Sequence, residues 1–380
     1  MRIRRRLPII LGVVLVAAAV VVVVQLRKHA PPEPARLLPS GDAFFYVNLS
    51  WLRRLNAVKQ LPPVSHDPEY ERFIQETGFQ FERDLDRAAF AVHYPTTWGG
   101  AGTPTGADQP RFSEVFEGDF HAEKLSAYLK KLARSVENYR SVDVYSIPLE
   151  SRTVRVAMIG VGTVAVSNHE DAAVIHGMID RSRKLASPFA GPAFLRQYYK
   201  YIPSNLPVPT LAWAIVRVEN GDRRFPLANG LWSLIIPGHA VVVVSARFLT
   251  ALHFRAEAFT NSQEDAQRVS EQASTFLNIF HAAENSAAGG TDPDVKQFFD
   301  SLKVEQHDAR AVLTATLSPG FIKKVLTEPP AVIGPGEEEK KNQVQPSPAR
   351  LNQHYQKARR SALSDLAGCI FRGSVASFYL

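Results

Sequence analysis

The sequence contains a single cysteine, Cys369, so no disulfide bond can form within the chain. Small extracellular domains without enough apolar core depend on several disulfides, and that class is excluded here. Any folded part must be held together by its apolar core, and the hydrophobic share of 45% is sufficient for one. Cys369 is interpreted as an inert thiol near the end of the chain.

Familiar catalytic motifs are also missing. The chain has no GxSxG, no P-loop, no HExxH and no CxxC. Gly160 and Gly162 lie in a strand turn without a third glycine leading into a helix, so they do not form a dinucleotide-binding fingerprint. We therefore assign no catalytic, cofactor-binding or metal-ligating residue and expect no cofactor. A catalytic site assembled in space from distant residues stays open.

The sequence also has little net charge outside the N-terminal region. The formal charge of +7 suggests a nucleic-acid or anionic-lipid partner only if it is spread over the folded part. Residues 1–36 hold seven Lys and Arg and one acid, which leaves 37 bases against 36 acids for the rest. No nucleic-acid partner is therefore expected.

Residues 7–26 form a long apolar run, in which Gln25 is the single polar side chain. Twenty helical residues rise about 30 Å, the thickness of a bilayer core. Four arginines in the basic segment 1–6 predict a cytoplasmic N-terminus, a single-pass anchor in the plasma membrane and an extracytoplasmic bulk. The alternative, a cleavable signal peptide, fits poorly because the run is long and is followed by Arg27 and Lys28.

The rest of the chain divides by composition. Residues 27–39 are proline-rich and predict a stiff spacer. Residues 40–187 and 188–327 each carry strand and helix patterns, residues 328–349 predict a disordered linker, and residues 350–380 predict a helix and tail. The pattern predicts the α+β class, with mainly antiparallel sheets and helices packed on one face. The elements of 40–187 and of 188–327 resemble two variants of one α+β unit.

Strands and helices are expected at specific positions in these units. The strands are predicted at 43–49, 88–94, 112–120, 142–147, 154–159, 163–167, 211–218, 231–236, 240–245, 252–259 and 309–317. A loop at 95–110 contains four glycines and three prolines. The longest helix, at 264–284, has an apolar stripe on which Phe276 and Phe280 are expected to be buried.

The most site-like cluster is Glu117, Asp119 and His121, at a strand-to-helix junction. These residue types suit an acid/base pair or a partial metal site. A structural interpretation is simpler, because Asp119 can cap the helix that continues through Leu125 and Val136. Asn168 is expected to cap the next helix, with His169, Glu170 and Asp171 in its first turn.

Three segments carry a resemblance to known proteins: LPSGDAFFYVNL, GDFHAEKLSAYLKK and SLKVEQHDARAVLTATLSPGFIKKVL. They are similar to segments of bacterial proteins of unknown function that have one N-terminal membrane anchor and an extracytoplasmic α+β domain. The resemblance spans residues 37–326 and implies location and fold class. It implies no functional residue.

These features predict a membrane-anchored envelope protein that binds or scaffolds rather than catalyses, with the bilayer and an envelope protein as partners. One alternative is an extracytoplasmic hydrolase with a spatially assembled site. Another is a carrier of apolar ligands held between the sheet and its helices, which aromatic-rich strands such as AFFYVNL allow. A polar cleft with convergent carboxylates would favour the hydrolase, and an open apolar cavity would favour the carrier.

Overall fold

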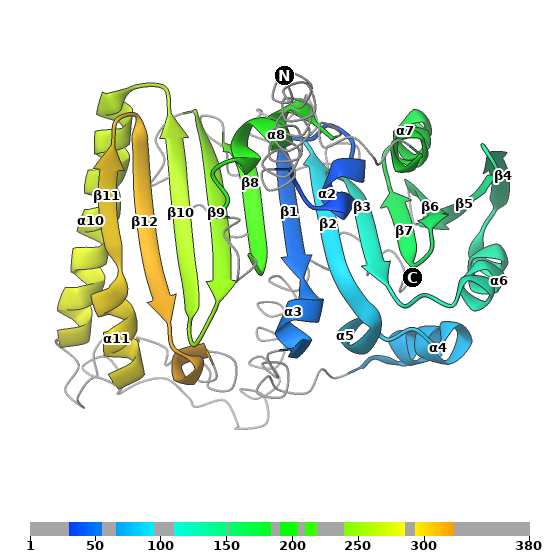
Figure 1. Cartoon of the computed structure of the whole chain (residues 1–380), viewed down its shortest axis with the longest axis horizontal. Coiled ribbons are helices and arrows are strands. Elements are labelled where there is room, and N and C mark those ends of the chain that lie inside the picture. The colour runs from blue at the N-terminus through cyan, green and yellow to red at the C-terminus, as the bar shows by residue number, and fades with distance from the viewer. Residues whose placement is uncertain are drawn as a thin grey trace, which may run out of the picture.

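A computed structural model describes residues 30–54, 66–94, 110–149, 152–183, 191–203, 210–218, 239–285 and 293–322. These residues form one open sheet of twelve strands in the order β11-β12-β10-β9-β8-β1-β2-β3-β7-β6-β5-β4, with every neighbouring pair antiparallel (Figure 1). The predicted α+β class with a mainly antiparallel sheet is confirmed. The strands are β1 (Ala43–Asn48), β2 (Leu85–His93), β3 (Arg111–Gly118), β4 (Ser135–Tyr139), β5 (Val142–Leu149), β6 (Arg152–Gly160), β7 (Thr163–Ser167), β8 (Ala212–Val218), β9 (Ala240–Phe248), β10 (Leu252–Thr260), β11 (Lys303–His307) and β12 (Arg310–Leu317).

The two expected sets of strands are joined into a single sheet at its centre. The first strand of each set, β1 and β8, pair directly, with Phe44 opposite Ile215 and Tyr46 opposite Trp213. In both halves three consecutive strands lie side by side, and the chain then returns from the far edge to pair with the third, β7 with β3 and β12 with β10. Separate sheets were the expectation, and the β1–β8 ladder of backbone hydrogen bonds removes the boundary between them.

Helices lie on both faces of the sheet, so the prediction that they pack on one face is wrong. We call face A the side that carries Phe44 and Tyr46 of β1, and face B the side that carries Phe45 and Val47, since successive strand residues point to opposite sides. The helices are α2 (Glu33–Leu37), α3 (Leu49–Arg54), α4 (Pro68–Thr77), α5 (Phe81–Asp84), α6 (Ala122–Leu132), α7 (Ala173–Ser182), α8 (Ala193–Tyr199), α10 (Gln263–Asn285) and α11 (Pro293–Ser301).

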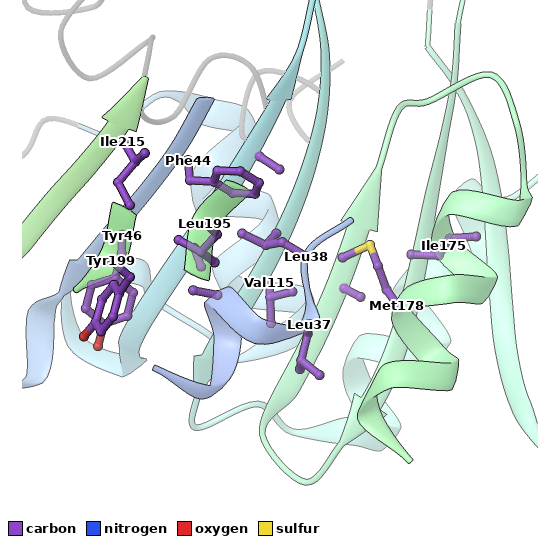
Figure 2. Close-up of a cluster of buried hydrophobic side chains, with 14 of the residues drawn as sticks. Leu37, Leu38, Phe44, Tyr46, Val115, Ile175, Met178, Leu195, Tyr199 and Ile215 are labelled. Carbon is purple, nitrogen blue, oxygen red and sulfur yellow. The ribbon is translucent and has the colours of Figure 1, made fainter. Parts of the chain in front are cut away.

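Each face has its own apolar core. On face A, α2, α7 and α8 contribute Leu37, Ile175 and Leu195 to a cluster with Phe44 (Figure 2). On face B, α4 and α6 cover the first half of the sheet with Phe73 and Leu125 among others. The second half of face B packs against α10, whose Val269 contacts a cluster of small apolar strand residues. The first half of the sheet is thus covered on both sides.

The predicted spacer at residues 27–39 needs a correction, because its second half belongs to the core. Residues Glu33–Leu37 form α2, with Pro34 in its first turn, where proline is well tolerated. Ala35, Leu37 and Leu38 are 0 to 1% exposed and contact the face A cluster. A proline-rich composition suggested an extended spacer, but burial of these three apolar side chains docks the segment on the sheet.

Several local predictions near helix starts are also wrong. Asp119 is not the N-cap of α6: that residue is His121, whose side chain forms no capping hydrogen bond. The backbone N–H of Asp119 donates to the backbone carbonyl of Asp84. Asn168 does not cap α7, because its side chain accepts a hydrogen bond from the backbone of Phe112. Val136, expected on the stripe of α6, lies on the edge strand β4 and is exposed.

The start of α4 offers a test of helix capping. The Asp67 carboxylate accepts hydrogen bonds from the backbone N–H groups of Glu69 and Tyr70, and Gly78 ends the helix with a positive φ. Asp67→Ala is expected to lower the free energy of unfolding by about 0.5 to 2 kcal/mol, whereas Asp119→Ala should change it by less than about 0.5. Chemical denaturation of the two variants side by side measures this. A larger loss for Asp119→Ala would reverse the assignment.

Some predictions fall on residues outside the described part of the chain. These are the anchor at 7–26, the loop at 95–109, the strand at 231–236 and the segments at 328–349 and 350–380. The side chains of Phe276 and Phe280 are outside it as well. Within the described residues, none of the helices combines the length and the apolar character needed to cross a bilayer.

Candidate functional site

Described residues line an apolar groove on face B at the centre of the sheet. It has a volume of about 380 Å³. We call it the face B groove and define it by the side chains that line it, which are Phe45, Val47, Phe90, Ala212, Ala214, Val216, Val218, Val242, Val244, Ala246 and Phe254, together with Tyr46 and Trp213. It lies where the two halves of the sheet meet.

The groove lies where the described helices of face B do not cover the centre of the sheet. Among the described elements, α10 contacts β10, β11 and β12, while α6 contacts β5 and α3 contacts β2. No helix of the described part contacts face B of β8 or β9 in a comparable way. Strand faces that are apolar and uncovered are uncommon on soluble domains and mark binding surfaces.

Strand alternation explains both the shape and the chemistry of the groove. In β8 the sequence AWAIVRV sends Ala212 and Ala214 to face B and the large Trp213 to face A. The two alanines and Ala246 of β9 keep the floor low. Phe45 on one side and Phe254 on the other rise above it, because phenylalanine side chains are much larger. A hollow between aromatic walls results.

One row of side chains on face B leads from the groove to a buried carboxyl group beyond it. The pairing runs from Val244 through Ala214, Phe45 and Phe90 to Glu114. Glu114 is buried, and its Oε2 atom has no hydrogen-bond partner among the described residues. Burial raises the pKa of this carboxyl well above its ordinary value, because a buried site disfavours the ionised form. Directly opposed side chains lie about 5 Å apart, which places Glu114 next to the groove residue Phe90.

The structure does not bring the predicted cluster of Glu117, Asp119 and His121 together. No hydrogen bond or ion pair among the described residues links the three side chains. Glu117 lies on face A, where its Oε2 atom is 2.7 Å from Nε of Arg87. His121 lies beside Gly78 at the end of α4. The acid/base and metal interpretations of this cluster therefore lack a shared geometry.

Glu117 nevertheless has an unusual environment. Burial raises its pKa to about 7; Arg87 opposes the rise, and Glu33 and Asp86 add to it. The contact with Arg87 forms no hydrogen bond to Oε2, so the guanidinium stabilises the ionised form only in part. Glu117 is thus a buried acid that titrates near neutrality, on the face opposite the groove.

A second polar cluster was missed from the sequence because its members come from three strands and a loop. Nε2 of His93 is 3.2 Å from the hydroxyl of Ser113, which is 3.0 Å from the hydroxyl of Ser167, and the ring of His169 stands edge-on to His93. Burial and the neighbouring His169 lower the pKa of His93 to about 4, and Asp42 opposes this.

A serine hydroxyl beside a neutral imidazole is the pair required for nucleophilic catalysis. Here Ser113 is 0% exposed, and both serine hydroxyls are engaged within the cluster. A substrate cannot reach a nucleophile closed off in this way. Within the described residues, no three His, Cys, Asp or Glu side chains are placed to hold a metal ion. The geometry gives the hydrolase alternative no accessible site in this part of the chain.

Comparison with known proteins adds little. No family model and no curated protein matches the chain. Crystal structures of TP0453, in crystal forms III, IV and I, are distant structural neighbours with 9%, 11% and 9% sequence identity and TM-scores of 0.43, 0.39 and 0.41. The matches cover 78%, 77% and 78% of this chain and 98%, 96% and 97% of those chains. Similarity at this level assigns no function.

Proposed function

We propose that this chain is a membrane-anchored, extracytoplasmic binding protein of the cell envelope that holds an aliphatic chain of a lipid-like ligand in the face B groove. The observation that carries the proposal is the groove itself, an apolar hollow at the one part of the sheet centre that no described helix covers. This favours the carrier over the hydrolase among the alternatives open from the sequence.

The size and chemistry of the groove suit such a ligand. Its volume of about 380 Å³ lies at the lower end of the range for small-molecule sites, about 300 to 1,000 Å³. Each buried methylene group contributes about 0.8 kcal/mol to binding, so a chain of moderate length gains several kcal/mol without any polar contact.

The anchor belongs to the same proposal. The apolar run at 7–26 and its basic flank support a single-pass protein of the plasma membrane with a cytoplasmic N-terminus and an envelope protein as a further partner. The resemblance to anchored bacterial proteins supports the same location. In both halves three consecutive strands are followed by a return from the far edge, which supports their interpretation as variants of one α+β unit, with the groove at the junction.

Photolabelling of the full-length protein in membranes tests ligand binding directly. The probe is a fatty acid with a diazirine group near the end of its chain, and the labelled peptides are mapped after irradiation. We expect label on peptides of β1, β8 and β9. Ala214→Trp fills the floor of the groove and should reduce this labelling at least tenfold, because the added indole occupies the site of the chain.

The matched control is Leu249→Trp, which adds the same indole at an exposed turn, where Leu249 is 49% exposed. It should leave the labelling unchanged. Label confined to residues 7–26, or equal label in the wild type and in Ala214→Trp, would refute the ligand proposal.

A further inference from the structure

The second half of the sheet also carries a polar hollow on face A, opposite the face packed against α10. It has a volume of about 580 Å³. The strand register places two adjacent rows of polar side chains along it. One row runs Ser245, Arg255, Thr314, Lys303, and the other runs Arg247, His253, Thr316. We call this the face A hollow. It is separate from the face B groove because Arg247 and its neighbour Ala246 project to opposite sides of β9.

The charges in the hollow are unbalanced. Arg247, Arg255 and Lys303 line it, whereas Asp300 is the single acid among the described lining residues. Arg255 is held by the buried Glu257 at 2.8 Å, and Glu257 also contacts Arg310 at 3.4 Å. The side chains of Arg247 and Lys303 form no hydrogen bond or ion pair with any described residue. Within the described part of the chain, these two cations have no direct partner.

Hydroxyl and imidazole groups complete the set of donors. The Oγ1 atom of Thr316 is 3.2 Å from Nδ1 of His253, which leaves Nε2 as the ring nitrogen open to a ligand. Ser301 hydrogen-bonds to the backbone of Thr316 and fixes the end of α11 against β12. The donors are mounted on paired strands, so their spacing is set by the sheet and not by mobile loops.

We propose that the face A hollow binds a phosphate group. Several cationic and hydroxyl donors that converge on one hollow match the oxygen atoms of phosphate, and the arginine fork is suited to contact two of them at once. The phosphate belongs either to a soluble phosphate ester or to a phospholipid head group. The chemistry of recognition is the same in both cases, and the inference does not depend on ligand binding in the face B groove.

Calorimetric titration of the full-length protein in micelles of a neutral maltoside detergent tests this site. The probes are inorganic phosphate, glycerol phosphate and dihexanoyl phosphatidylglycerol, each at the same ionic strength set with chloride. We expect saturable binding of at least one probe. The double variant Arg247→Gln, Lys303→Gln should weaken it at least tenfold, and it should unfold at the same temperature as the wild type without phosphate, because neither side chain is paired with a described residue.

The control is the double variant Lys124→Gln, Lys130→Gln, which removes the same charge from exposed positions on α6. It should bind like the wild type. Equal weakening in both double variants, or no binding of any probe, would overturn the proposal, because only a diffuse charge effect would remain. If the monoester and inorganic phosphate bind more tightly than the diester, the ligand is a soluble phosphate, and the reverse order identifies a lipid head group.

Discussion

Replacing Leu37 by alanine is expected to lower the free energy of unfolding by about 2 to 5 kcal/mol. Leu37 is 1% exposed and lies in the face A cluster, where α2 contacts α7 and strands β2 and β3. The loss combines the transfer free energy of the removed atoms with the cavity left between these elements. An effect of this size is a large share of the total stability of a domain. Chemical denaturation of the full-length protein in micelles measures it.

The control for this prediction is Leu249→Ala, the same substitution at a turn where the side chain is largely exposed. It should change the free energy of unfolding by less than about 0.5 kcal/mol. An equally small effect of Leu37→Ala would mean that residues 33–38 do form a free spacer. A large effect establishes that the folded part begins before the first strand, so truncation at residue 39 should destabilise the protein.

The second large effect is a pH dependence that disappears in Glu117→Gln. The pKa of Glu117 is raised from its ordinary 4.5 to about 7, first by burial. The folded protein therefore holds this proton more tightly than the unfolded chain. The stability gained from it is fully present below pH 4.5 and is lost as the pH rises through 7. At about 1.4 kcal/mol for each unit of pKa shift, the loss is roughly 3 kcal/mol.

Glutamine cannot ionise, so the free energy of unfolding of Glu117→Gln relative to the wild type should rise by roughly 3 kcal/mol between pH 4.5 and 7. Denaturation curves of both proteins across this range measure the difference. His93 serves as the internal comparison, because its pKa is lowered from 6.5 to about 4. Its contribution is full above pH 6.5 and is lost as the pH falls towards 4, so His93→Gln should show the opposite trend. Parallel curves for wild type and Glu117→Gln would contradict the environment assigned to Glu117.

Much of the secondary structure could be predicted from local patterns. The strands around Ala89, Val156 and Val242 contain apolar residues that do not follow the 3.6-residue period of an amphipathic helix. The helix α4 is marked by Asp67 before its start and Gly78 after its end. The pairing of β1 with β8 could not be predicted, because their partners in the ladder are about 170 positions apart and no local signal records such contacts.

The groove illustrates the same limit at the level of the site. AFFYVNL suggested an apolar site, and Phe45 and Val47 do line the groove. Whether their face is covered depends on where α10 and α6 end, which periodicity does not reveal. Asp119 and His121 show the reverse error, since as neighbours of Glu117 in the sequence they were expected to share a site with it. The strand β3 ends at Gly118, the backbone of Asp119 bonds to Asp84, and His121 is the N-cap of α6.

The central position of β1 has a consequence for the order of folding during synthesis. Domains form largely from the N-terminus onwards, and the strands from β1 to β7 pair among themselves. Until β8 leaves the ribosome, one side of the β1 backbone therefore has free N–H and C=O groups beside the apolar segment AFFYVN. Such an edge is a template for pairing with another chain. The nascent protein thus passes through an aggregation-prone intermediate until β8 pairs with the free edge of β1. A chain that stops before Ala212 should therefore accumulate as aggregates.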